Sequence, residues 1–140
     1  MSVHEEASRF NFLLNNFVKG TSGVADAVAV SADGLLMARS ESLDDAGADQ
    51  VAAIISGFVS LGQGAVRCFA FDGLHQIIVA MKGGYLFVSS MADAGCLGIV
   101  ATPKCDIGNV GYQMALLVDR CGEMLDPELI NVLKAQVLVR

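Results

Sequence analysis

The segment from Val51 to Val66 contains no charged residue, although its apolar residues recur with the period of an α-helix. The apolar positions of this pattern are Val51, Ile54, Ile55, Phe58, Leu61, Ala65, Cys68 and Phe69. The opposite side carries small and uncharged polar residues: Ala53, Ser56, Gly57, Ser60, Gln63 and Gly64. A surface helix normally shows a charged face to water. This helix is therefore predicted to be covered on both sides, either by its own chain alone or with the help of a second copy.

Three glycines within this segment favour the second copy. Gly57, Gly62 and Gly64 each cost about 1 kcal/mol relative to alanine in a helix interior, and close packing against another backbone would compensate for that cost. The hydrophobic fraction of the chain, 54%, also exceeds the roughly 45–50% of ordinary soluble domains. A central helix wrapped entirely by its own chain remains the alternative.

The charge of the chain argues against nucleic acid and anionic membranes as partners. The net charge is −6, and the nine Lys and Arg residues are scattered rather than grouped in a basic stripe. The start of the sequence has no secretory signal pattern, and the longest uncharged run, Gln50 to Val66, is too short to span a bilayer. We therefore expect a cytoplasmic protein without membrane insertion.

Apolar periodicity and turn residues predict one layered α+β domain. The expected order is helix, two strands, helix, three strands, helix and a C-terminal helical tail, with tight hairpins that make the sheet antiparallel and helices on both of its faces. The expected segments are a helix capped at Ser2, strands 24–30 and 35–40, a helix over about 44–70, strands 74–81, 85–91 and 96–101, a helix from Thr102-Pro103 to Gly122, and a helix opened by Asp126-Pro127. Residues 1–122 are predicted to form the domain, and residues 123–140 a tail that packs on the domain or on a partner.

No residue pattern in the sequence indicates catalysis, a cofactor or a metal. A P-loop would require a run that ends in Gly-Lys-Ser/Thr, and Gly62-Gln63-Gly64 is only a lone fragment inside a helix. The two histidines, His4 and His75, and the four cysteines show no metal-ligand spacing. A cysteine nucleophile with His75 as its base is conceivable, but reduced and mostly buried thiols are the favoured interpretation of Cys68, Cys96, Cys105 and Cys121.

The order of these elements and several short motifs resemble the roadblock/dynein-light-chain family. The resemblance covers nearly the whole chain and is strongest to the stand-alone actinobacterial members, whose genes lie beside a sensor kinase and a small GTPase. It rests on the strand from Val24 to Val30 with the Ser31–Gly34 turn, on Phe12-Leu13-Leu14, Ala53-Ile54-Ile55-Ser56-Gly57, Gly84-Tyr85-Leu86-Phe87-Val88 and Gly95-Cys96-Leu97, and on Met114-Ala115-Leu116-Leu117-Val118 before Asp126-Pro127-Glu128-Leu129.

The resemblance implies a profilin-like α-β-α layered domain with a five-stranded antiparallel sheet, and a dimer formed by the second helix and the strand after it. It implies no catalytic residue, and Arg39 and Arg67 are not expected to act as arginine fingers. The predicted homodimer interface comprises Ala53, Ser56, Gly57, Ser60, Gln63, Gly64, Arg67, Gln76 and Ile78.

Two functions remain open at this point. The first is a non-enzymatic homodimeric regulator or scaffold for a small Ras-like GTPase, with a sensor kinase as a further partner in the same signalling module. The second is a profilin-like sensory or scaffold domain that binds a small ligand or a kinase without a GTPase.

Overall fold

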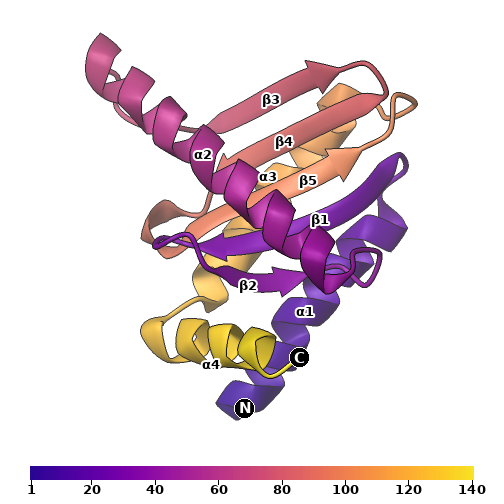
Figure 1. The fold of residues 1–140 in the computed structure, drawn as a ribbon, viewed down its shortest axis with the longest axis vertical. Coiled ribbons are helices and arrows are strands. Elements are labelled where there is room, and N and C mark those ends of the chain that lie inside the picture. The colour runs from indigo at the N-terminus through magenta and orange to yellow at the C-terminus, as the bar shows by residue number, and fades with distance from the viewer.

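The computed structural model describes residues 1–140, and its element order is the predicted one (Figure 1). The elements are α1 (Val3–Gly20), β1 (Val24–Ser31), β2 (Leu36–Arg39), α2 (Asp45–Phe69), β3 (Gln76–Met81), β4 (Gly84–Ser90), the short 3₁₀-helix η1 (Ala92–Ala94), β5 (Gly95–Ala101), α3 (Ile107–Met124) and α4 (Pro127–Leu138). The predicted α+β class, with helices on both faces of the sheet, is confirmed.

The five strands form one antiparallel sheet in the order β2-β1-β5-β4-β3. Two hairpins, β1–β2 and β3–β4, are joined by β5, which pairs with β1 on one side and with β4 on the other. This arrangement leaves β2 and β3 as the two edges of the sheet.

Alternation along the strands creates two separate cores. Val28 and Val30 of β1 pack on the face that α2 covers, whereas Ala27 and Ala29 pack on the opposite face, under α1 and α3. We call these the α2 face and the α1/α3 face. Figure 1 shows α2 lying diagonally across its face, with its C-terminal end extending past the sheet.

Helix α2 is long for the sheet that it covers. Its 25 residues span about 37 Å at 1.5 Å per residue, whereas five strands are about 19 Å across at roughly 4.8 Å between neighbours. It begins where the Asp44 side chain accepts a hydrogen bond from the backbone N–H of Gly47 (2.7 Å), and it ends at Ala70 in a left-handed conformation. The mismatch in length leaves its C-terminal turns without cover from this chain.

The third helix begins later than the sequence predicted. Pro103 lies in a turn in which the N–H of Cys105 donates to the carbonyl of Thr102 (3.1 Å), and α3 starts only after Asp106, whose side chain accepts from the N–H of Asn109. The predicted end of this helix at Gly122 was also wrong, since Gly122 lies inside the helix. Ile107, which the pattern placed in the buried stripe, is exposed. The third strand begins at Gln76 rather than at Leu74.

Candidate interaction surface

The outer face of α2 is open to solvent along its whole length. Only Ala48, Ala52 and Ile55 of this helix are fully buried, against the α2 face of the sheet. The small-residue strip predicted from the sequence lies on the opposite side, where Ala53, Gly57 and Ser60 are exposed. This chain leaves most of the strip open, with only Ser56 and Gly64 half-buried, so the alternative of a helix wrapped entirely by its own chain is wrong.

Large apolar side chains flank this strip. Leu61 is 74% exposed, Ile54 is 51% exposed, and Phe69 and Phe71 lie on and just beyond the end of α2 with their ring centroids 5.6 Å apart. The sequence pattern had placed Ile54, Leu61 and Phe69 on the buried side. They are exposed because the helix is longer than its sheet is wide, and because the stripe of α2 that contacts the sheet is narrower than the apolar side of its sequence pattern. Contiguous apolar surface of this kind usually marks a site of protein association.

The β3 edge borders the same region. β3 pairs with β4 on one side only, so its other row of backbone N–H and C=O groups is free to pair with another strand. Two apolar side chains stand along it, Ile78 at 46% exposure and Met81 at 55%. An open edge of six residues with apolar side chains is a ready template for strand pairing.

The structure divides the predicted interface residues between two places. The seven residues on α2 share its outer side and the flank that faces the β1–β2 turn. Gln76 and Ile78 of β3 lie instead on the α1/α3 face: the Gln76 amide is 3.9 Å from the sulfur of Met114, and Ile78 pairs with the buried Phe87. A partner that meets both groups must therefore approach the β3 edge rather than lie flat on one face.

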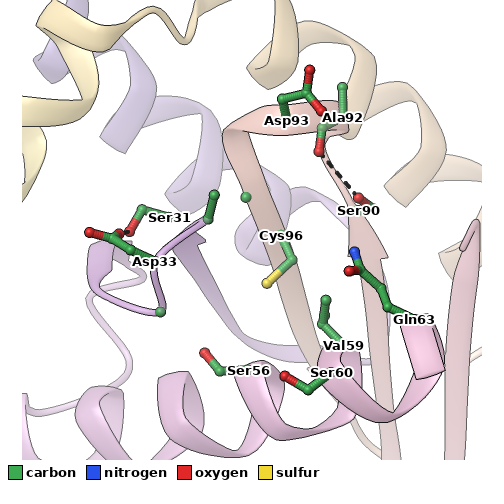
Figure 2. A pocket seen from close by; sticks show the side chains of 13 residues that line it. Ser31, Asp33, Ser56, Val59, Ser60, Gln63, Ser90, Ala92, Asp93 and Cys96 are labelled. Carbon is green, nitrogen blue, oxygen red and sulfur yellow. Dashed lines mark hydrogen bonds between the residues drawn. The ribbon is translucent and has the colours of Figure 1, made fainter.

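A polar cleft of about 490 Å³ adjoins the flank of α2 (Figure 2). It opens between α2, the β1–β2 turn and the β4–β5 turn. Ser60 and Gln63 point into it, Asp93 stands at its rim, and none of the three has a hydrogen bond from another side chain. The other hydroxyls nearby bond within the chain: Ser56 donates to the carbonyl of Ala52 and Ser90 to that of Ala92. The cleft contains two carboxylates and no basic side chain, a composition that disfavours phosphate ligands.

Two of the four thiols lie in the cores of the domain, Cys121 on the α1/α3 face and Cys96 on the α2 face. Burial raises the pKa of Cys96 to about 11 and that of Cys121 to about 12, so both are protonated at neutral pH. Cys68 is exposed on α2 and Cys105 is half-buried. No three His, Cys, Asp or Glu side chains lie together in an arrangement that could hold a metal ion.

Comparison with known proteins decides the family. The sequence model of the Roadblock/LC7 domain matches residues 11–101, from α1 to the end of β5. The chain belongs to the Roadblock/LC7 domain family. The expected resemblance is thereby confirmed over the part of the chain that contains the whole sheet and α2.

Solved roadblock structures have the same architecture. A Roadblock/LC7 domain from Streptomyces avermitilis superposes with a TM-score of 0.74 at 33% identity, over 79% of this chain and 92% of that one. The gliding protein MglB from Thermus thermophilus has a TM-score of 0.74 at 15% identity, over 89% of this chain and 91% of that one. An MglB solved in a tetrameric arrangement has a TM-score of 0.76 at 14% identity, over 85% and 89%. At such low identity the MglB likenesses show the fold alone. The sequence matches none of the curated proteins with which it was compared.

The roadblock fold also explains the apolar character of α2. Helix α2 is the one helix of the chain that is long and apolar enough to cross a membrane, judged by length and composition. Its 25 residues exceed the uncharged run Gln50 to Val66, from which the sequence predicted no membrane span. Its inner side packs on the sheet of the domain, and its outer side is interrupted by Ser60, Gln63 and Arg67.

Proposed function

We propose that this roadblock protein is a non-enzymatic homodimeric regulator or scaffold that binds a small Ras-like GTPase in the cytoplasm, in a signalling module that includes a sensor kinase. The observation that carries the proposal is the pair of uncovered surfaces described above, the outer face of α2 and the edge of β3. They adjoin each other, both carry exposed apolar side chains such as Leu61 and Ile78, and this chain leaves most of their area uncovered.

A second copy fits these two surfaces together. If two β3 strands pair antiparallel across a two-fold axis, the two sheets become one, and each α2 that extends past its own sheet comes to lie over the sheet of its partner. The strip of Ala53, Gly57, Ser60 and Gly64 lets the two helices approach closely. The tetrameric arrangement of one MglB supports self-association as a property that this fold permits.

The GTPase part of the proposal rests on the family resemblance and on what this chain lacks as a nucleotide-binding protein. It has no P-loop, and its cleft contains carboxylates where a triphosphate would need positive charge. The family resemblance instead supports a role in binding a protein that itself carries the nucleotide. The switch loops of such GTPases are ordered by the γ-phosphate and released on hydrolysis. A surface that fits one arrangement of these loops binds it preferentially and shifts its population.

Titration calorimetry tests this proposal. The purified protein is titrated with the small GTPase encoded nearest to it in the same genome, loaded first with GDP and then with a non-hydrolysable GTP analogue. We expect binding that differs between the two nucleotide states, and no nucleotide hydrolysis by the roadblock protein alone. Equal affinity in both states would leave a scaffold and remove the regulator, and absence of binding in both states would contradict the GTPase role.

The cleft of Figure 2 favours a second candidate, a sensory domain that binds a small ligand. Ser60 and Gln63, with the Asp93 carboxylate at the rim, would bind a small neutral or cationic molecule with hydroxyl or amine groups. A thermal-shift screen with amines and polyols tests it, and Asp93→Asn is the diagnostic variant. A ligand whose stabilising effect disappears in that variant, in a protein that binds no GTPase, would favour this function over the first.

A further inference from the structure

The two edges of the sheet differ in their surroundings. The β3 edge is open, whereas α4 runs beside the β2 edge (Figure 1). The first half of α4 is anchored on the α1/α3 face, where Leu129 and Leu133 are fully buried. Its second half reaches the other core, because Val137 packs with the residues of the α2 face. Helix α4 therefore passes along the edge of β2 from one layer of the domain to the other.

Grooves on both sides of α4 mark its course past β2. On one side, Met37 and Ala38 of β2 face Gln136 and Val137 of α4 across a groove. On the other side, Leu36 shares a groove with Lys134 and Val137. No backbone hydrogen bond joins β2 to α4. The free N–H and C=O groups of the β2 edge are thus shielded by the helix rather than paired with it.

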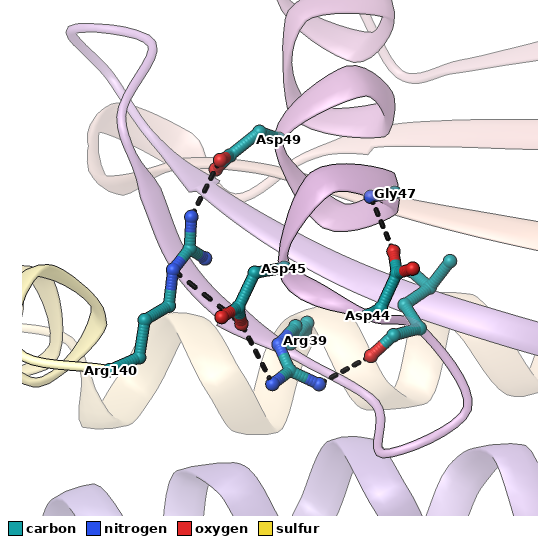
Figure 3. Close-up of polar contacts among 7 residues, drawn as sticks. Arg39, Asp44, Asp45, Gly47, Asp49 and Arg140 are labelled. Carbon is teal, nitrogen blue, oxygen red and sulfur yellow. Dashed lines mark hydrogen bonds and ion pairs between the residues drawn. The ribbon is translucent and has the colours of Figure 1, made fainter.

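Charges hold the second half of α4 in this position. The Lys134 ammonium lies 3.1 Å from a carboxylate oxygen of Asp33 in the β1–β2 turn. The Arg140 guanidinium contacts Asp49 at 2.5 Å and Asp45 at 3.5 Å, both in the first turns of α2 (Figure 3). Arg39 of β2 bonds to Asp45 as well, at 3.0 Å. The network ties α4 to α2 across the end of the β2 strand.

The two halves of α4 are therefore held by different forces. The first half is fixed by apolar burial, which salt does not weaken. Of the apolar residues in 134–140, only Val137 packs into a core as part of the helix end, since Leu138 and the following Val139 are exposed. The carboxylates of the ion pairs are more than half exposed, and ion pairs open to water contribute little stability individually and are screened by salt. The second half can thus detach while Leu129 and Leu133 keep the first half in place.

We propose that residues 134–140 form an ion-pair-held strap that keeps a second copy of this chain from pairing with β2. The proposal rests on the homodimer proposed above, in which copies associate through β3. With β2 shielded, the sheet can be extended from one edge only, and assembly stops at two copies. With β2 exposed, each dimer has two further free edges, and such contacts do not close.

Charge reversal in the strap tests this inference. The variant Lys134→Glu/Arg140→Glu repels Asp33, Asp45 and Asp49. The matched control is Lys104→Glu/Arg120→Glu, which makes the same change in net charge at exposed residues that form no ion pair. Sedimentation velocity is measured over a dilution series of each protein. We expect the weight-average mass of the strap variant to rise to about twice that of the wild type or more, and that of the control to stay unchanged.

Two further measurements separate edge pairing from misfolding. The charge swap Asp33→Lys/Lys134→Glu keeps Arg140 and re-forms the first ion pair with its charges exchanged, so it should leave the mass at the wild-type value. Hydrogen exchange should show unchanged protection of the central strands β1 and β5 in the strap variant, together with slower exchange of the β2 amides at concentrations where the mass rises. A rise in the mass of the strap variant without slower hydrogen exchange of its β2 amides would overturn the strap.

The outcome also distinguishes this inference from the homodimer on which it rests. A monomeric wild type would overturn the homodimer, and the strap variant would then be expected to form dimers through β2. Equal masses for the wild type and the strap variant would overturn the strap whatever the state of the wild type.

Discussion

The side chain of Ile55 lies directly over the α-carbon of Gly98, so that a methyl group at residue 98 would overlap Cδ1 and Cγ1 of Ile55. Gly98 belongs to β5, the central strand, and pairs with Val28 on the α2 face. The glycine thus lets α2 approach the middle of the sheet. This contact holds in place the helix on which the proposed dimer depends.

Gly98→Ala is expected to destabilise the protein by about 1–3 kcal/mol, because the core must shift to admit the methyl group. Urea denaturation followed by circular dichroism measures the loss. In an Ile55→Val background, which removes the overlapped Cδ1 atom, the same substitution should cost less by about 0.5 kcal/mol or more. Equal costs in the two backgrounds would show that the two residues do not compete for this space.

The four thiols are expected to react in two groups. At pH 8 a thiol reagent should modify Cys68 fastest and the half-buried Cys105 more slowly, whereas Cys96 and Cys121 stay unmodified. Their pKa values, raised to about 11 and about 12 by burial, leave almost no thiolate at that pH. In denaturant all four should titrate. Mass spectrometry of the modified protein identifies the sites, and rapid modification of Cys96 in the native protein would contradict its burial.

Burial of the same two thiols predicts a loss of stability at alkaline pH. Because their pKa values are raised above the ordinary value of 9.0, the unfolded state releases its thiol protons first as the pH rises. Their contribution to the free energy of unfolding is complete below pH 9 and is lost between pH 9 and about pH 11 to 12. Urea midpoints at pH 8 and pH 10 measure the loss. In Cys121→Ala the decrease between these pH values should be smaller than in the wild type.

Ser60→Arg is expected to convert the dimer into a monomer. Ser60 stands in the middle of the small-residue strip on α2, and an arginine there would place an unpaired charge in the proposed helix–helix contact. Ser8→Arg is the matched control, because Ser8 is an exposed serine on the unrelated helix α1. Multi-angle light scattering distinguishes the two variants. A monomeric wild type, or a Ser60→Arg protein that remains dimeric, would contradict this interface.

The sequence predicted the fold through local patterns that the structure keeps. The capping residues Ser2, Asp44 and Asp126 each accept a hydrogen bond from the first turn of the helix that they precede. The predicted start of α3 at Thr102-Pro103 was wrong, because a proline is as favourable in an isolated turn as it is in the first turn of a helix. Only the backbone course after β5 decides between the two.

The candidate surface was harder to predict than the fold. Periodicity assigned Ile54 and Leu61 to the buried side of α2, because a pattern records which residues are apolar and not how wide a stripe the sheet covers. The length of the helix relative to the sheet contained the missing signal, but the width of the sheet depends on pairing between β1 and β5, which are distant in sequence. The strap could not be predicted from the sequence either, because its ion pair joins Asp33 and Lys134, which are 101 residues apart in the chain.

A pair of helix glycines tests whether the outer face of α2 is truly packed in solution. Nothing in the chain lies within 4 Å of a methyl group added at Gly57 in α2 or at Gly122 in α3. For an isolated chain, alanine at either position should therefore stabilise its helix by about 1 kcal/mol. Gly57, however, lies in the strip that we expect to contact the partner's α2, where an added methyl group would separate the helices.

We predict that Gly122→Ala raises the thermal unfolding temperature and leaves the dimer unchanged, whereas Gly57→Ala raises the dissociation constant of the dimer. Unfolding scans and a dilution series by analytical ultracentrifugation measure the two effects. The same stabilisation in both variants, with unchanged dimerisation, would show that the strip stays open and that the partner binds elsewhere.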